Sequence, residues 1–179
     1  MDSTKIVLSS IDAVYLPIHT GDIQYIASQF TALLLETQLI GNGSWYDPLE
    51  LSDDLISQNV DGMIVVSNLV EPQHKDSQKQ LSISQDDFTS RREFLMALAG
   101  YDAMEFLSAN IGSKPNRIEL LASFESPQFY RGTSRIHSFT EQSLKVNSAS
   151  SVLKYHRGNF ETVAEFIADT LVSFTPSAP

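Results

Sequence analysis

The apolar run MIVV at residues 63–66 directly follows an Asp-Gly turn at residues 61–62. A continuous run of this kind predicts a central strand that is buried on both faces of a sheet. Before the turn, residues 52–60 predict a short helix, with Asp53 and Asp54 in its first turn, where the helix dipole favours negative charge. The chain must therefore pack helices on a sheet, and we see only one such helix–turn–strand unit.

Three further segments carry the three- and four-residue spacing of apolar side chains that is typical of helices. They are residues 21–40, 84–110 and 159–174. Alternating or β-branched apolar segments predict strands at residues 117–125, 129–139, 144–146 and 152–155, and a strand or extended arm over residues 5–8 and 13–18.

Together these segments predict an α+β fold, with a mixed, mostly antiparallel sheet of four to six strands packed by three or four helices. Pro17 lacks a backbone donor, so the strand at 13–18 is expected at a sheet edge or to end there. A length of 179 residues favours a single α+β domain over residues 1–179. We expect an extended N-terminal arm at 1–18, a mobile polar loop at 71–83 and a C-terminal tail at 175–179.

Composition excludes several classes of site. The chain has no cysteine, which rules out disulfides, thiolate metal sites and iron–sulfur clusters. Its four histidines lack metal-binding spacing, and no dinucleotide, phosphate-loop or nucleophile-elbow motif occurs. We therefore predict no cofactor, no metal site and no enzymatic activity.

The formal net charge of −10 argues against binding to nucleic acid or to an anionic membrane. The first residues lack the basic and apolar regions of a secretory signal, and no apolar stretch is long enough to span a bilayer. These features predict a cytoplasmic protein, or a virion protein if the source is viral.

The acidic charge lies wholly in the first half of the chain. Residues 1–89 hold thirteen acidic side chains and three lysines, whereas residues 90–179 hold nine acidic and nine basic side chains. Opposed charged surfaces favour head-to-tail self-association. We therefore expect the chain to bind copies of itself and other protein subunits.

Eight residues are candidates for interaction sites. Trp45 and Tyr46 are possible aromatic anchors. If their strands pair, Arg131, Arg135 and His137 share a face with His156 and Arg157, which would suit an anion or phosphoester. The eight candidates are Trp45, Tyr46, Asp53, Asp54, Arg131, Arg135, His137 and Arg157.

The leading functional hypothesis is a non-enzymatic structural or assembly subunit of a larger particle, such as a phage tail or neck component. It follows from the missing catalytic motifs, the opposed charge halves and the apolar residues that spread beyond single helix faces. One alternative is a small acidic adaptor, chaperone or immunity-type binding module. Another is an enzyme that uses the His/Arg anion site.

Overall fold

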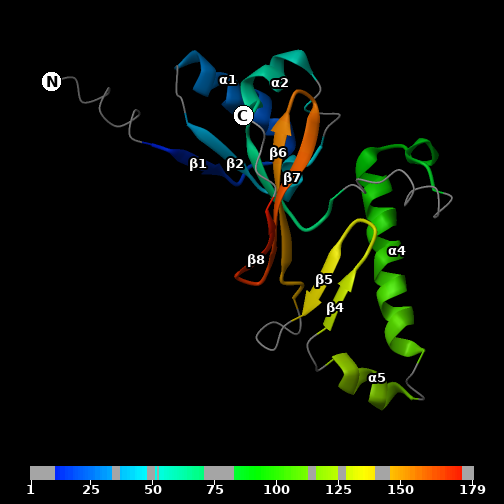
Figure 1. Ribbon diagram of the computed structural model, residues 1–179. Helices are drawn as coiled ribbons and strands as arrows, with labels where there is room; N and C mark the ends of the chain where they lie inside the picture. Colours follow the sequence, from blue (N-terminus) through cyan, green and yellow to red (C-terminus); the bar gives the residue numbers. More distant parts are fainter. Residues whose placement is uncertain are drawn as a thin grey trace. The chain divides into compact units, whose positions relative to one another are not determined.

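The computed structural model describes residues 11–33, 37–47, 51, 53–70, 83–112, 116–124, 128–139 and 146–174 (Figure 1). The predicted strand at 5–8, most of the strand at 144–146, nearly all of the loop at 71–83 and the tail at 175–179 lie outside these residues. The chain divides into two compact units. Unit 1 is Met1–Ser67, Val152–Ala164 and Thr175–Pro179, and unit 2 is Asn68–Ser151 and Glu165–Phe174.

Unit 1 contains two successive strand–helix pairs, which are followed by a third strand. The order is β1 (Ala13–Leu16), α1 (Ile23–Ala32), β2 (Gln38–Gly41), α2 (Asp54–Val60) and β3 (Ile64–Ser67). The three strands are parallel neighbours, and β1 lies at the edge, as Pro17 predicts. The predicted helix over 21–40 is too long, because residues 38–41 are strand β2. The expectation of only one helix–turn–strand unit is wrong for the same reason.

The core of unit 1 lies between this sheet and its helices. α1 packs against α2, and Ile23, Ala27 and Val60 from these helices are buried. β3 contributes the buried Val65, but its neighbour Val66 is 43% exposed. The prediction that this strand is buried on both faces is therefore wrong.

The last three strands complete the larger sheet, whose order is β1-β2-β3-β6-β7-β8. They are β6 (Ala149–His156), β7 (Asn159–Ile167) and β8 (Thr170–Phe174). Arg157 and Gly158 connect β6 to β7 with positive φ angles of 46° and 87°, which is the backbone of a two-residue type I′ hairpin turn. This turn overturns the predicted helix over 159–174, whereas the predicted strand at 152–155 is confirmed.

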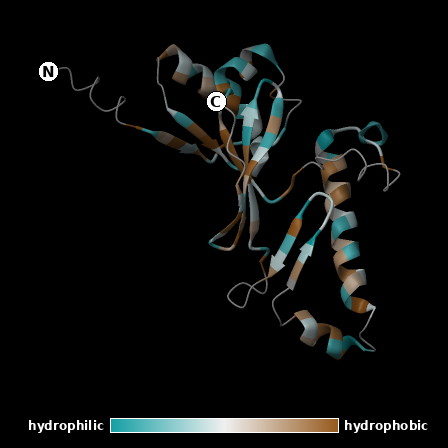
Figure 2. Cartoon of the chain, in the orientation of Figure 1, coloured by the Kyte–Doolittle hydropathy of each residue, from teal (hydrophilic) through white to brown (hydrophobic). Residues whose placement is uncertain are grey.

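Unit 2 contains the longest helix in the described part of the chain, α4 (Arg91–Ile111). Ser90 caps it by accepting a hydrogen bond from the Glu93 N–H, whereas Ser84 caps only the preceding short helix η5 (Gln85–Asp87). Figure 2 shows apolar and hydrophilic residues interspersed along α4.

The segment expected to be a strand at 117–125 is helix α5 (Arg117–Phe124). Asn116 accepts hydrogen bonds from the N–H groups of Ile118 and Glu119, both at 3.0 Å, and so starts this helix. The single bent strand predicted at 129–139 is instead an antiparallel hairpin of β4 (Gln128–Arg131) and β5 (Ile136–Phe139).

The described residues thus form a mixed sheet of six strands, a two-stranded sheet and four α-helices. This confirms the predicted α+β fold class.

Candidate functional site

The carboxyl ends of β1, β2 and β3 lie at one edge of the sheet, because the three strands are parallel. In open α/β sheets, ligands bind in the crevice outside this edge. Here the edge is formed by the short helix η2 (Thr20–Asp22) after β1, the short helix η3 (Gly43–Trp45) after β2, and Ser67 at the end of β3. We call residues 17–22, residues 42–45 and Ser67 the carboxyl-edge loops.

Hydrogen bonds connect the loops after β1 and β2. The Asn42 side chain accepts from the Ser44 N–H at 2.9 Å, and the Ser44 hydroxyl donates to the Ile18 carbonyl at 3.3 Å. The Thr20 hydroxyl, which belongs to a buried residue, donates to the Ser44 carbonyl. These bonds fix the two loops against each other, while His19, Gly43 and Ser44 remain exposed to solvent.

The buried Trp45 side chain holds the same loops in place. Its ring is fully buried, and its Nε1–H donates to the Ile18 carbonyl at 3.0 Å. A Cβ added at Gly41 would lie 2.4 Å from the Trp45 ring, so only glycine leaves space for the indole at this position. The result is a preformed polar surface held by a rigid aromatic side chain.

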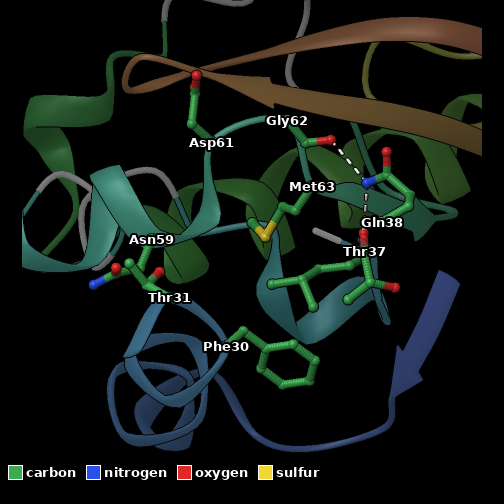
Figure 3. Close-up of a pocket in the computed structure, with 9 residues that line it drawn as sticks. Phe30, Thr31, Thr37, Gln38, Asn59, Asp61, Gly62 and Met63 are labelled. Atoms are coloured by element: carbon green, nitrogen blue, oxygen red, sulfur yellow. Dashed lines mark hydrogen bonds between the residues drawn. The ribbon is translucent and has the colours of Figure 1, made fainter. Parts of the chain in front are cut away.

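A cavity of about 450 Å³ lies at the opposite, amino edge of β2 and β3 (Figure 3). The ends of α1 and α2 and the starts of the two strands surround it. Its lining residues are Phe30, Thr31, Thr37, Gln38, Leu39, Asn59, Asp61, Gly62 and Met63.

In unit 2, a buried carboxylate fixes the hairpin turn to α4. Asp102 is fully buried and accepts hydrogen bonds from the N–H groups of Thr133 and Ser134, both at 2.7 Å, and from the Ser134 hydroxyl at 2.8 Å. A Cβ at Gly132 would lie 2.5 Å from the Asp102 Cγ. These contacts hold the turn in place, so the carboxylate has a structural role.

The predicted His/Arg cluster lies in part within an aromatic core of unit 2. His137 is buried and stacks on Phe106 with ring centroids 5.4 Å apart. Burial lowers the pKa of His137, the positive charge of Arg135 lowers it further, and Asp102 opposes the shift. His137 Nε2 has no hydrogen-bond partner among the described residues. The imidazole is therefore harder to protonate than that of an exposed histidine.

The arginines of the predicted cluster have separate surroundings. The Arg131 guanidinium donates two hydrogen bonds of 3.1 Å to the Glu165 carboxylate, which lowers the pKa of Glu165. Arg157 lies in unit 1, where its N–H donates to Asp61, and His156 pairs with the same carboxylate at 3.1 Å. The structure thus places Arg131, Arg135 and His137 in one unit and Arg157 with His156 in the other.

The remaining predicted residues all lie in unit 1. Tyr46 is buried and packs edge-to-face on Phe160, with ring centroids 4.9 Å apart. Asp53 and Asp54 are exposed at the start of α2. A role of the eight residues in interaction stays a prediction. Sequence reasoning missed Asn42, Ser44 and Thr20, although the turn cluster at 41–44 after an apolar pair is the signal that marks a strand's carboxyl end.

The described part of the chain contains neither a metal-binding cluster nor a helix suited to span a membrane. No three histidine or acidic side chains there gather closely enough to hold a metal ion. None of the helices there combines the length and apolarity needed to cross a bilayer.

No protein-family model matches the sequence. A comparison with curated proteins finds no match either.

Solved structures, in contrast, share the fold. A putative branched-chain amino acid ABC transporter from Rhodospirillum rubrum matches with a TM-score of 0.68 and 19% identity, over 85% of this chain and 44% of its own. A branched-chain amino acid ABC transporter from Thermus thermophilus with bound valine matches with a TM-score of 0.60 and 12% identity, over 89% of this chain and 47% of its own. An extracellular ligand binding receptor from Desulfohalobium retbaense matches with a TM-score of 0.52 and 14% identity, over 84% of this chain and 26% of its own. The chain spans less than half the length of each of these proteins.

These likenesses correct the functional predictions from the sequence. The fold is one found in transport-associated and extracellular ligand-binding proteins, so the prediction of a phage tail or neck subunit is wrong. The predicted self-association and protein partners, and the cytoplasmic or virion location, are wrong for the same reason. Charge asymmetry and missing catalytic motifs misled the prediction, because both features are equally compatible with a protein that binds a small molecule.

Proposed function

We propose that the chain binds a small organic solute as part of a solute-binding protein of the kind that serves ABC transporters. The observation that carries this proposal is the fold, which solved transporter and receptor proteins share over 84–89% of this chain. The low identities leave the solute open, and we infer its class from the site.

The carboxyl-edge loops are the proposed solute site. They lie where open α/β sheets bind ligands, and they present exposed polar groups at His19, Gly43 and Ser44. The hydrogen bonds through Asn42 and the buried Trp45 fix this surface before a ligand arrives. Preorganisation reduces the entropic cost of binding.

A small carboxylic acid with an apolar body is the proposed solute class. One similar structure contains bound valine, which belongs to this class. Hydroxyl and amide groups at the site suit the polar end of such a molecule. The proposed location is outside the cytoplasm, in keeping with the similar extracellular receptor.

Thermal unfolding in the presence of valine, leucine, isoleucine and p-hydroxybenzoate tests the proposal. A ligand present at a hundred times its Kd stabilises the folded state by about 2.7 kcal/mol. We expect at least one of the four compounds to raise the Tm in a saturable manner.

Two matched variants locate the effect. Ser44→Glu adds bulk and negative charge in the carboxyl-edge loops and is expected to abolish the increase in Tm. Ser108→Glu makes the same change at an exposed position of α4 and should leave it intact. The proposal is wrong if no compound in the panel raises the Tm at millimolar concentration, or if both variants respond as the unmodified protein does.

A further inference from the structure

We propose that the cavity at the amino edge of β2 and β3 is a second site, which binds a small organic ammonium ion. β2 spans four residues, so about 13 Å of strand separates this edge from the carboxyl-edge loops. The two sites therefore lie at opposite ends of the same strands, and the second does not depend on the proposed function.

The size and walls of the cavity suit a small organic molecule. A volume of about 450 Å³ is within the range of ligand pockets. Figure 3 shows Phe30 reaching in from α1, with Met63 on the side of β3. Leu39 and Met63 are buried and Phe30 is half-buried. These three side chains supply an apolar wall, and an aromatic face also attracts cations.

Two polar side chains of the cavity, Gln38 and Thr37, can accept a hydrogen bond from a ligand. The Gln38 amide Nε2 donates to the carbonyls of Leu39 at 3.0 Å and Gly62 at 2.9 Å, which leaves its Oε1 as an acceptor. Thr37 Oγ1 is shielded from solvent and has no hydrogen-bond partner among the described residues. A buried hydroxyl without a partner is costly, so a ligand that forms a hydrogen bond with it is favoured, and an ammonium group can do so by donating.

The charge of the surroundings selects a cation. Among the residues that the structure describes, none of the nine that line the cavity is a lysine or an arginine. Both α1 and α2 end at this edge, and the carboxyl end of a helix carries partial negative charge. The described part of unit 1 contains two basic residues, Lys154 and Arg157, and seven acidic ones, which are Asp12, Asp22, Asp47, Asp53, Asp54, Asp61 and Glu161.

Asp61 contributes through its charge rather than by direct contact. Its Oδ1 accepts from the Arg157 N–H at 2.9 Å and pairs with His156 at 3.1 Å. Figure 3 shows its side chain directed away from Phe30. The direct contacts to the ammonium group therefore fall to Thr37 and Gln38, with the hydrocarbon body against Phe30 and Met63.

Three probes of matched shape test the charge preference. They are 2-phenylethylammonium, 2-phenylethanol and phenylacetate, whose binding is followed by calorimetry and by backbone amide NMR shifts. We expect the ammonium compound to bind, the alcohol to bind more weakly and the carboxylate not to bind. The shifts caused by the ammonium compound should include the amides of Gln38, Gly62 and Met63.

Three variants test the position. Thr37→Val removes the unpartnered hydroxyl, so it should not destabilise the fold, and it should weaken binding roughly fivefold. Thr31→Trp places a bulky ring at the exposed rim and should abolish binding, whereas Gln29→Trp, on the same helix but outside the cavity, should not.

The proposal is overturned if phenylacetate binds as well as the ammonium compound. It is also overturned if the shifts lie outside the cavity, or if the two tryptophan variants behave alike. None of these three results bears on solute binding at the carboxyl-edge loops, which Thr31→Trp should leave unchanged. The two proposals can therefore fail separately.

Discussion

Replacement of Asp102 by alanine is expected to cost more stability than any exposed substitution in unit 2. The fully buried carboxylate accepts two backbone N–H bonds and one hydroxyl bond, at 2.7, 2.7 and 2.8 Å. Hydrogen bonds to a charged group are worth about 1.5–3 kcal/mol each. The variant also removes the desolvation cost of the carboxylate, so the contributions do not simply add.

The expected net loss is about 3–5 kcal/mol in the free energy of unfolding. The N–H and hydroxyl of Ser134 account for much of it, because Ser134 is buried and both groups lose their acceptor. Asp102→Asn should cost less stability than Asp102→Ala, because the amide oxygen can still accept a hydrogen bond. It should still cost some stability, because the amide nitrogen cannot accept from the donors that faced the second carboxylate oxygen. Asp169→Ala, at an exposed turn of the same unit, is the matched control and should change stability by less than about 0.5 kcal/mol.

Urea unfolding with two probes measures this loss. Far-UV circular dichroism is sensitive to α4, which belongs to unit 2. Trp45 is the only tryptophan and lies buried in unit 1, so its fluorescence follows the other unit. The reasoning is refuted if Asp102→Ala lowers the free energy of unfolding by less than about 1 kcal/mol, because a buried carboxylate with three donors cannot then be the anchor of the turn.

Two further predictions concern buried positions. Because burial and Arg135 lower the pKa of His137 in the folded protein, the unfolded chain takes up the proton first, so stability should fall as the pH drops below about 6.5. His137→Gln should show a smaller loss between pH 7.5 and pH 5.5 in urea unfolding, and an unchanged pH dependence would contradict this account. Gly41→Ala should lose about 1–3 kcal/mol by forcing Cβ against the Trp45 ring, whereas Gly100→Ala, in an open position of α4, should gain about 0.5–1 kcal/mol. Equal effects of the two glycine variants in thermal unfolding would show that the indole does not need the space at Gly41.

The sequence was most informative where a segment was long or bounded by clear turn residues. The helix expected over residues 84–110 is present as Arg91–Ile111, with its start seven residues later because residues 85–87 form the separate short helix η5, and the strand expected at 63–66 is Ile64–Ser67. The strand at 38–41 was missed because only residues 33–37 separate it from α1, and its apolar pair extends the helical spacing of Ile26, Phe30 and Leu33. With that strand hidden, the repeated strand–helix pattern could not be recognised.

In two segments the periodicity of the apolar residues predicted the wrong type of secondary structure. Residues 117–124 alternate in polarity, but the pair Asn116 and Glu119 forms a helix start, with the Asn116 amide donating to the Glu119 carboxylate at 3.0 Å. Residues 159–174 show apolar spacing of three and four, yet the Arg157-Gly158 turn before them imposes a hairpin. In both cases a local capping or turn signal outweighs the apolar spacing.

The candidate sites were harder to predict than the fold, because they depend on contacts between distant segments. Ser44 approaches Ile18 only after β1 and β2 pair, and Gln38 meets Gly62 only after β2 and β3 pair. The residues that the sequence did single out were chosen for their chemistry, and the structure shows that Trp45 and His137 are buried in the core.

Separate NMR titrations of the isotope-labelled chain with valine, leucine, isoleucine and p-hydroxybenzoate test solute binding at the carboxyl-edge loops most directly. The account predicts that at least one of these compounds causes saturable shifts of the backbone amides of Thr20, Gly43 and Ser44, with the amides of Gln38 and Gly62 at the opposite edge unchanged. If branched-chain amino acids and p-hydroxybenzoate all leave the amides of Thr20, Gly43 and Ser44 unmoved, or if the shifts fall in unit 2 alone, the proposed solute site is wrong.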